Sequence, residues 1–321
     1  MRLSFAPIAL LASLSHASFA EAREVVLRAV SAWTEGTEFS RNFERFIDKV
    51  NADGKGEIQI RYIGGPRAIP TFEIGNAVRS RVVDIANSTG AYYANIMPEA
   101  DSIKLLSLPM SVQRSNGTWD YLNHLHNQRL NSWYLARQFH NVKYHLYLNK
   151  KIHGLNLQGL KIRVTPIYRD IVESMGGVPI TTSPNDIYTA LERGVVDGFG
   201  WPITGIFDLG VQKVTKYRLE PGFYSADANV LVNLDAWKEL SDTQRRILNE
   251  AAHWLEALDF DKVADIRRER EQQTNAGIEP LTLSSENEKT FLTLAKESAW
   301  KSIVKRAPET GPQLQALSEK E

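Results

Sequence analysis

Apolar positions recur first at strand spacing and then at helix spacing, twice over, between residues 159 and 202. Residues 160–164 alternate apolar and charged, which predicts a strand. Helical spacing follows and stops at the paired glycines 176–177, and after a short apolar strand Ser183 with its following proline is typical of a helix start. Residues 195–198 predict another strand. Strands that alternate with helices in so short a stretch predict a parallel sheet.

An earlier part of the chain repeats this pattern. We expect strands at 24–33, 57–63 and 82–86, with helices between them. Residues 73–84 match residues 186–197 without a gap, each 113 positions after its counterpart, and both segments end in Val-Val-Asp. This match predicts two similarly built α/β units.

The remaining segments read as connections. Residues 142–149 and 228–233 alternate like strands and are expected to cross between the two units. From 241 to 276 the pattern predicts one long helix. A coiled-coil dimer is the alternative for such a length, but the apolar seam fades across the charged run 267–272.

Composition limits the possible function. The 321 residues carry 38 basic and 38 acidic side chains, so nothing indicates a nucleic-acid partner. Cysteine is absent, which excludes disulfides, thiolate metal sites, a cysteine nucleophile and a lipoprotein anchor. Three histidines lie between 118 and 140, but their spacing favours a solvated helix over a metal site, and we expect no metal or cofactor.

The first 20 residues are typical of a secretory signal peptide. Arg2 precedes the apolar run 6–14, and Ser18-Phe19-Ala20 has the small residues of a cleavage site. The apolar run is too short to span about 30 Å of hydrocarbon. We therefore expect export to the periplasm and a mature chain from about Glu21.

Arg163 is the residue in this pattern with the clearest chemistry. It lies near the carboxyl end of a strand that is otherwise apolar, and ligands of open parallel sheets bind beyond that end. A guanidinium can hold a carboxylate through two parallel hydrogen bonds. From spacing alone, an internal salt bridge is the alternative.

The strand Gly159–Val164 (GLKIRV) and the later run around Gly194–Gly198 (GVVDG), with Tyr188, Ala190 and Leu191 before it, resemble the solute-binding proteins of tripartite ATP-independent periplasmic (TRAP) transporters. The family's usual glutamate is Asp186 here. The resemblance implies that Arg163 holds a ligand carboxylate and that membrane carrier subunits are the partners. We expect a monomer that binds a small organic acid.

The resemblance also implies an α/β fold of two lobes with a central cleft and a long helix, 241–276, bridging both lobes. Lobe I is expected to comprise 21–143 and 229–258, and lobe II 144–228 and 278–321.

The other candidate ligand contacts are aromatic and polar residues at strand ends and on the crossing strands. For each of them, ordinary core packing is the alternative. Alternation places His145, Tyr147 and Asn149 on one strand face. The predicted set alongside Arg163 consists of Trp201, Tyr92, Tyr93, Trp33, His145, Tyr147, Asn149 and Asn229.

A bulky indole at Trp201 and a single strong cation favour a monocarboxylate, either an aromatic or a 2-oxo acid. A receptor of the same family for C4-dicarboxylates or sugar acids is the alternative. A periplasmic enzyme is less favoured, because the chain has neither G-x-S-x-G nor H-E-x-x-H. A binding protein that serves a sensor or an ATP-driven transporter is the other rival.

Overall fold

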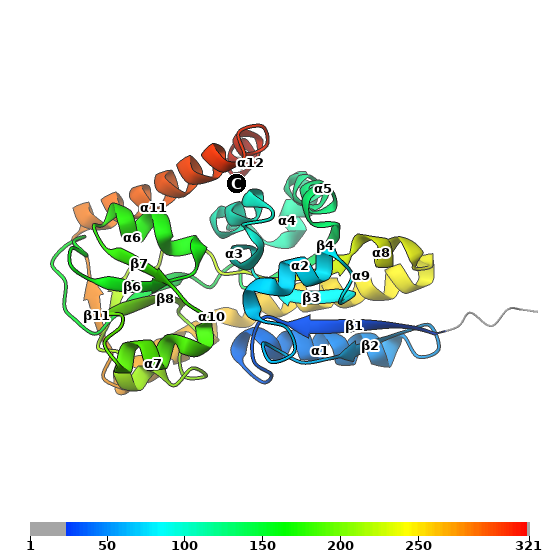
Figure 1. Cartoon of the computed structure of the whole chain (residues 1–321), viewed down its shortest axis with the longest axis horizontal. Helices are drawn as coiled ribbons and strands as arrows, with labels where there is room; N and C mark the ends of the chain where they lie inside the picture. Colours follow the sequence, from blue (N-terminus) through cyan, green and yellow to red (C-terminus); the bar gives the residue numbers. More distant parts are fainter. Residues whose placement is uncertain (1–23, 320–321) are drawn as a thin grey trace, which may run out of the picture.

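A computed structural model describes residues 24–319. The chain forms two α/β lobes, each built on one sheet (Figure 1). The expected signal peptide lies outside the described residues. No helix within the described part of the chain is long and apolar enough to cross a membrane.

The lobe I sheet has five strands in the order β2-β1-β3-β10-β4. Strands β1 and β2 and strands β1 and β3 pair in parallel, whereas β10 runs antiparallel to both of its neighbours. The strand bounds are β1 Val25–Ser31, β2 Ile58–Tyr62, β3 Ile85–Ser88, β4 Ser132–Gln138 and β10 Ala228–Asn233.

The lobe II sheet has six strands in the order β11-β9-β5-β8-β6-β7. Strand β6 is parallel to β7 and β8, and β5 is antiparallel to β8. The strand bounds are β5 Tyr144–Leu148, β6 Lys161–Val164, β7 Val178–Thr181, β8 Gly198–Pro202, β9 Tyr217–Glu220 and β11 Glu279–Thr282.

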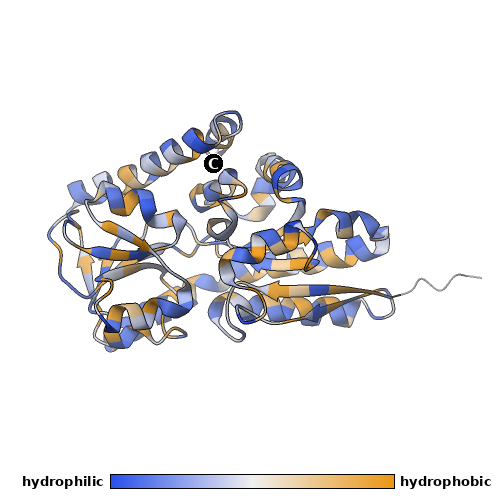
Figure 2. Ribbon diagram, in the orientation of Figure 1, coloured by the Kyte–Doolittle hydropathy of each residue, from blue (hydrophilic) through white to orange (hydrophobic). Residues whose placement is uncertain are grey.

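Helices cover both sheets, and Figure 2 shows that they carry hydrophilic and hydrophobic residues side by side, as expected of amphipathic helices. Helix α1 packs against β2 and α9 and buries Phe43 and Phe46 in the lobe I core. The α-helices are α1 Glu38–Asp53, α2 Ile74–Arg79, α3 Gly90–Tyr93, α4 Met110–Ser115, α5 Thr118–Leu130, α6 Arg169–Ser174, α7 Ile187–Glu192, α8 Leu234–Glu239, α9 Asp242–Ala257, α10 Lys262–Asn275, α11 Ser285–Arg306 and α12 Gly311–Ser318. The 3₁₀ turns are η1 Thr71–Glu73, η2 Pro98–Leu105, η3 Pro166–Tyr168, η4 Pro184–Asp186, η5 Val211–Val214 and η6 Leu258–Asp261.

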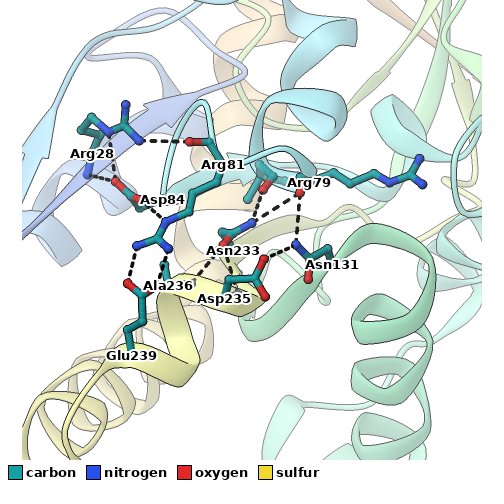
Figure 3. A network of polar contacts seen from close by, with 10 residues as sticks. Arg28, Arg79, Arg81, Asp84, Asn131, Asn233, Asp235, Ala236 and Glu239 are labelled. Atoms are coloured by element: carbon teal, nitrogen blue, oxygen red, sulfur yellow. Dashed lines mark hydrogen bonds and ion pairs between the residues drawn. The ribbon is translucent and has the colours of Figure 1, made fainter.

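The internal repeat is confirmed in detail. The segments η1-α2-β3 and η4-α7-β8 begin at positions that match in the two halves. Arg81 and Gly194 occupy equivalent left-handed positions, with φ of 59° and 68°. Asp84 accepts a hydrogen bond from the backbone N–H of Arg28, and Asp197 accepts one from that of Lys161. In lobe I the Asp84 carboxylate also joins the network of Arg28, Arg81 and Glu239 drawn in Figure 3.

The expected single helix over 241–276 is wrong in one respect, because the 3₁₀ turn η6 divides it into α9 and α10. Helix α9 buries Leu248, Ala251 and Leu255 in the lobe I core, whereas α10 is largely polar. Within η6, the carboxylate of Asp259 accepts hydrogen bonds from the backbone N–H and the ring of His140. The turn is therefore held at a point where the chain passes between the lobes.

Candidate ligand-binding site

A small cavity lies between the two sheets, where β3, β6 and β8 end. Its volume is about 20 Å³, so the side chains that line it leave little free space in this closed form. The cavity is lined by Trp33, Phe39, Thr89, Ala91, Tyr92, Tyr144, Arg163, Thr165, Tyr168, Trp201, Pro202 and Asp227. All of these are buried, so the lobes are closed over the cavity.

Arg163 is fully buried (0% exposed) near the end of β6. Its Nε and Nη2 donate to the carbonyl oxygen of Thr182 at 3.1 and 2.7 Å, which fixes the plane of the guanidinium. Its Nη1 has no hydrogen-bond partner among the described residues, and no described carboxylate forms an ion pair with it. Burial lowers the pKa of this group from its usual value. The alternative of an internal salt bridge therefore does not apply, and the Arg163 guanidinium is a buried cation without an ion-pair partner among the described residues.

Aromatic rings form most of the remaining wall. Trp33 packs on Phe39 and Tyr92, with ring centroids 5.3 and 5.9 Å apart, and Trp201 meets Phe39 edge-on at 5.8 Å. The indole Nε1 of Trp201 is a second buried donor without a partner among the described residues. A compact, flat molecule with one anionic group is complementary to such a site.

Lobe II contributes two more rings. Tyr144 at the start of β5 and Tyr168 in η3 meet edge-on at 5.2 Å. Burial raises the pKa of both phenols well above the usual value, so both remain neutral donors.

The structure brings four of the predicted contacts to the cavity: Arg163, Trp201, Tyr92 and Trp33. Each lies at or just after the carboxyl end of a parallel strand, where ligands of open sheets bind. Burial raises the pKa of Tyr92 to about 12, which keeps its hydroxyl protonated.

Tyr93 and Asn229 do not line the cavity. The Tyr93 hydroxyl contacts the ring of His126 at 3.1 Å and accepts a hydrogen bond from the side chain of Asn229 at 3.2 Å. Tyr93 follows Tyr92 on a short helix and therefore points the other way, into the lobe I core.

His145, Tyr147 and Asn149 also lie away from the cavity. Strand β5 is antiparallel to β8, so only its first residue, Tyr144, lies beside the cleft end of β8, opposite Pro202. His145 faces β9, where its Nδ1 contacts the carbonyl oxygen of Leu219 at 2.9 Å, and burial lowers its pKa to about 4. The hydroxyl of Tyr147 is bonded to Pro202 and Gln273.

Sequence reasoning missed several lining residues. Tyr144 lies on the opposite face of β5 from the predicted set, and the strand direction that decides between them is not visible in the alternation. Phe39 lies on the buried face of α1, and that face continues into the cavity. Asp227 precedes β10 in a segment with no periodic pattern to indicate it.

The structure offers no candidate metal centre in the part of the chain that it describes, since no three histidine or acidic side chains gather there as metal ligands would. His126, one of the three histidines considered, is buried beside Tyr134 and has its pKa lowered to about 4 by burial.

Comparison with known proteins now identifies the family. Residues 29–306 match the model of bacterial extracellular solute-binding protein family 7. The chain belongs to this family. Its members include the TRAP solute-binding proteins that the sequence resembles. A periplasmic protein of Nostoc sp., named as binding monocarboxylate 2-oxoacids, is 22% identical over 237 residues, which span 70% of this chain and 64% of that protein. The match thus covers slightly less than two thirds of that relative.

Solved structures of family members share the two-lobed fold. A Desulfovibrio salexigens TRAP solute-binding protein with bound orotic acid has a TM-score of 0.82, 18% identity, and coverage of 92% of this chain and 97% of that one. A Bordetella pertussis receptor that binds pyroglutamic acid has a TM-score of 0.79, 19% identity, and coverage of 92% and 99%. A Bordetella bronchiseptica TRAP protein with bound calcium and picolinate has a TM-score of 0.80, 19% identity, and coverage of 93% of each chain.

Proposed function

We propose that this TRAP solute-binding protein is a periplasmic receptor for a compact monocarboxylate. The observation that carries the proposal is Arg163, a buried guanidinium with no carboxylate partner among the described residues, set in a cavity walled by aromatic rings. It is the only Arg or Lys among the residues that line the cavity. A second carboxylate on the ligand would lack a cationic partner there, which disfavours dicarboxylates.

The aromatic walls support a flat or small apolar body. Both acid classes favoured by the sequence, aromatic and 2-oxo acids, fit this description. Orotate, pyroglutamate and picolinate, bound by the similar structures, are single carboxylates on one ring. Two other similar structures hold the sugar acids gulonate and galactonate, whose many hydroxyls need more polar partners than these rings supply.

In this proposal the lobes open to admit the acid and close around it, and the membrane carrier subunits of a TRAP transporter then receive it from the receptor. The ligand drives closure by binding the closed form more tightly. In this proposal the receptor works as a monomer. An exported enzyme and a sensor-coupled protein are the alternatives. Transport assays with candidate TRAP carrier subunits would separate the three.

The test is calorimetric titration of the mature protein with picolinate, benzoylformate, succinate and gulonate. Arg163→Met should weaken binding of the preferred acid by about 100-fold or more, because hydrogen bonds to charged groups contribute about 1.5–3 kcal/mol each. Arg163→Lys should recover only part of the affinity, since an ammonium cannot form the two-pronged contact.

Arg169→Met is the matched control, because Arg169 lies six residues on at the exposed start of α6 and should bind as the wild type does. Wild-type affinity in Arg163→Met would remove the basis of the proposal. Tight binding of succinate alone would keep the receptor and exclude the monocarboxylate class, and tight binding of gulonate alone would keep the receptor and exclude a flat or apolar ligand body.

A further inference from the structure

An acidic side chain lines the cavity together with Arg163. Asp227 directly precedes β10, is 2% exposed, and forms part of the cavity wall. A buried carboxylate is costly in a site for anionic ligands, because it repels any acid that enters. A ligand would therefore need a group that offsets the repulsion from the Asp227 carboxylate.

Every hydrogen bond to Asp227 uses it as an acceptor. Oδ1 accepts from the hydroxyl of Thr89 at 2.8 Å, and Oδ2 accepts from the backbone N–H of Gly90 and the side-chain amide of Asn229, both at 2.7 Å. Three donors aimed at one carboxyl group stabilise its ionised form. Two carboxylate oxygens offer about four acceptor positions, so capacity for one more donor remains.

No cationic side chain among the described residues occupies the free acceptor position of Asp227. Asp227 forms no ion pair with any described side chain, and the nearby Arg137 instead donates to the carbonyl oxygens of Leu106 and Ala226. Burial in itself favours the protonated form of Asp227 and raises its pKa. The charge of the Arg137 guanidinium and the three donors oppose that effect.

We propose that Asp227 accepts a hydrogen bond from an N–H or O–H of the ligand while Arg163 holds the ligand's carboxylate. This rests on the proposed function and narrows its ligand class. The receptor then prefers monocarboxylates that carry a donor near the acid group, such as 2-hydroxy acids or lactam acids, over the matching 2-oxo acids and lactones. Its cavity pairs one cation with one anion, so it rejects a second carboxylate both by lacking a partner and by repulsion.

The proposal can be tested with two pairs of ligands. Within each pair, the two acids differ chiefly in whether they carry this hydrogen-bond donor. Mandelate and benzoylformate differ by a hydroxyl in place of a keto oxygen, and pyroglutamate and its lactone analogue differ by N–H in place of ring oxygen. Calorimetric titration of the wild type should give dissociation constants at least about tenfold lower for the donor-bearing member of each pair that binds.

Asp227→Asn keeps the side-chain volume and removes the charge. The ratio of the two dissociation constants within each pair should therefore fall to about threefold or less. A merely structural role would weaken both members of a pair equally and leave the ratio unchanged. If this variant does not fold, the wild-type ratios decide alone. Equal affinities, or preference for benzoylformate, in the wild type would overturn the role of Asp227 while leaving the receptor intact. Failure of all four acids to bind, or binding that Arg163→Met does not weaken, would instead remove the proposed function.

Discussion

Gly200 determines where the Tyr168 ring can lie. A Cβ added at Gly200 would sit 2.7 Å from atoms of that ring, well inside contact distance. The ring cannot retreat into the sheet and would have to move toward Tyr144, which it already meets at 5.2 Å. Because Gly200 has no Cβ, the Tyr168 ring can pack against β8 and form one wall of the cavity.

Gly200→Ala should accordingly weaken binding of the preferred acid by tenfold or more and lower the free energy of unfolding by about 1–3 kcal/mol, as overpacking does. Calorimetric titration and urea unfolding measure the two effects. Gly194→Ala is the matched control: its added Cβ meets nothing within 4 Å, but its φ of 68° strains any side chain. It should lose about 1 kcal/mol of stability and keep full affinity. Unchanged affinity in Gly200→Ala would show that the Tyr168 position is not critical.

At this scale the sequence identifies residues that stand at the ends of parallel strands. Arg163 and Trp201 were predicted because ligands collect at that edge. Tyr144 was not predicted. Whether Tyr144 or His145 reaches the cavity depends on the direction in which β5 crosses the sheet. Asp227 was not predicted, because its three donors, two from the start of α3 and one from β10, assemble around it only in the folded chain.

Helix α1 obtains its N-terminal cap from the other lobe. Its own N-cap residue, Thr37, makes no side-chain capping bond, and the free N–H of Glu38 donates instead to Asp208 at 2.6 Å. Asp208 lies in the loop that follows β8 in lobe II. Lys262 of α10 then reaches the side chain of Glu38 at 2.9 Å. These contacts exist only while the lobes are together, so they stabilise the closed form.

Asp208→Ala should remove about 1 kcal/mol from the closed form, the usual contribution of a cap, and so weaken ligand binding about fivefold although Asp208 does not line the cavity. X-ray scattering should show a larger radius of gyration at partial ligand saturation. Ser241→Ala is the control, because Ser241 caps α9 within lobe I and its loss should reduce stability without changing affinity. Equal effects of the two variants on affinity would contradict a role for Asp208 in closure.

Elements were predicted best where the chain repeats itself. The match between residues 73–84 and 186–197 corresponds to the same helix and following turn in both lobes, because local spacing specifies them. The strands expected at 82–86 and 195–198 begin later, at Ile85 and Gly198, because each Val-Val-Asp forms the turn that precedes the strand. The break at η6 was not predicted, since the helical pattern runs through it and the cause is a tertiary contact between Asp259 and His140.

At the scale of the whole molecule, Glu269 lies where the lobes meet, among acidic and basic side chains of both. Burial raises the pKa of Glu269 in α10 to about 7, and the nearby carboxylates of Glu38 in lobe I and Asp208 in lobe II add to the effect. A carboxyl group with a raised pKa binds its proton more tightly in the folded state. Its contribution to stability is therefore complete below its ordinary pKa of 4.5 and is lost as the pH rises through about 7.

Glu269→Gln should remove this pH dependence. The free energy of unfolding of the variant minus that of the wild type should increase between pH 5.5 and pH 8.0, because only the wild type acquires a further negative charge there. Urea unfolding at the two pH values measures the difference, and other titrating groups cancel in the comparison. A constant difference between variant and wild type would show that Glu269 ionises normally.

The two-lobed arrangement itself was predictable only through the resemblance, because alternation and helical spacing specify α/β units but not how two of them face each other. The three segments that pass between the sheets, around 139–143, 221–227 and 258–261, are the parts of the chain whose paths depend on both lobes at once.

Because every residue around the cavity is buried, an acid inside it has no exit until the lobes separate. Its residence time is then governed by the rate of opening rather than by diffusion out of a groove. We therefore expect the proposed receptor to retain its ligand through cell lysis and chromatography, so that protein isolated under native conditions should carry the acid that it captured in the cell. Mass spectrometry of the denatured preparation would then identify the natural ligand directly, and titrations require protein that has been unfolded, dialysed and refolded first.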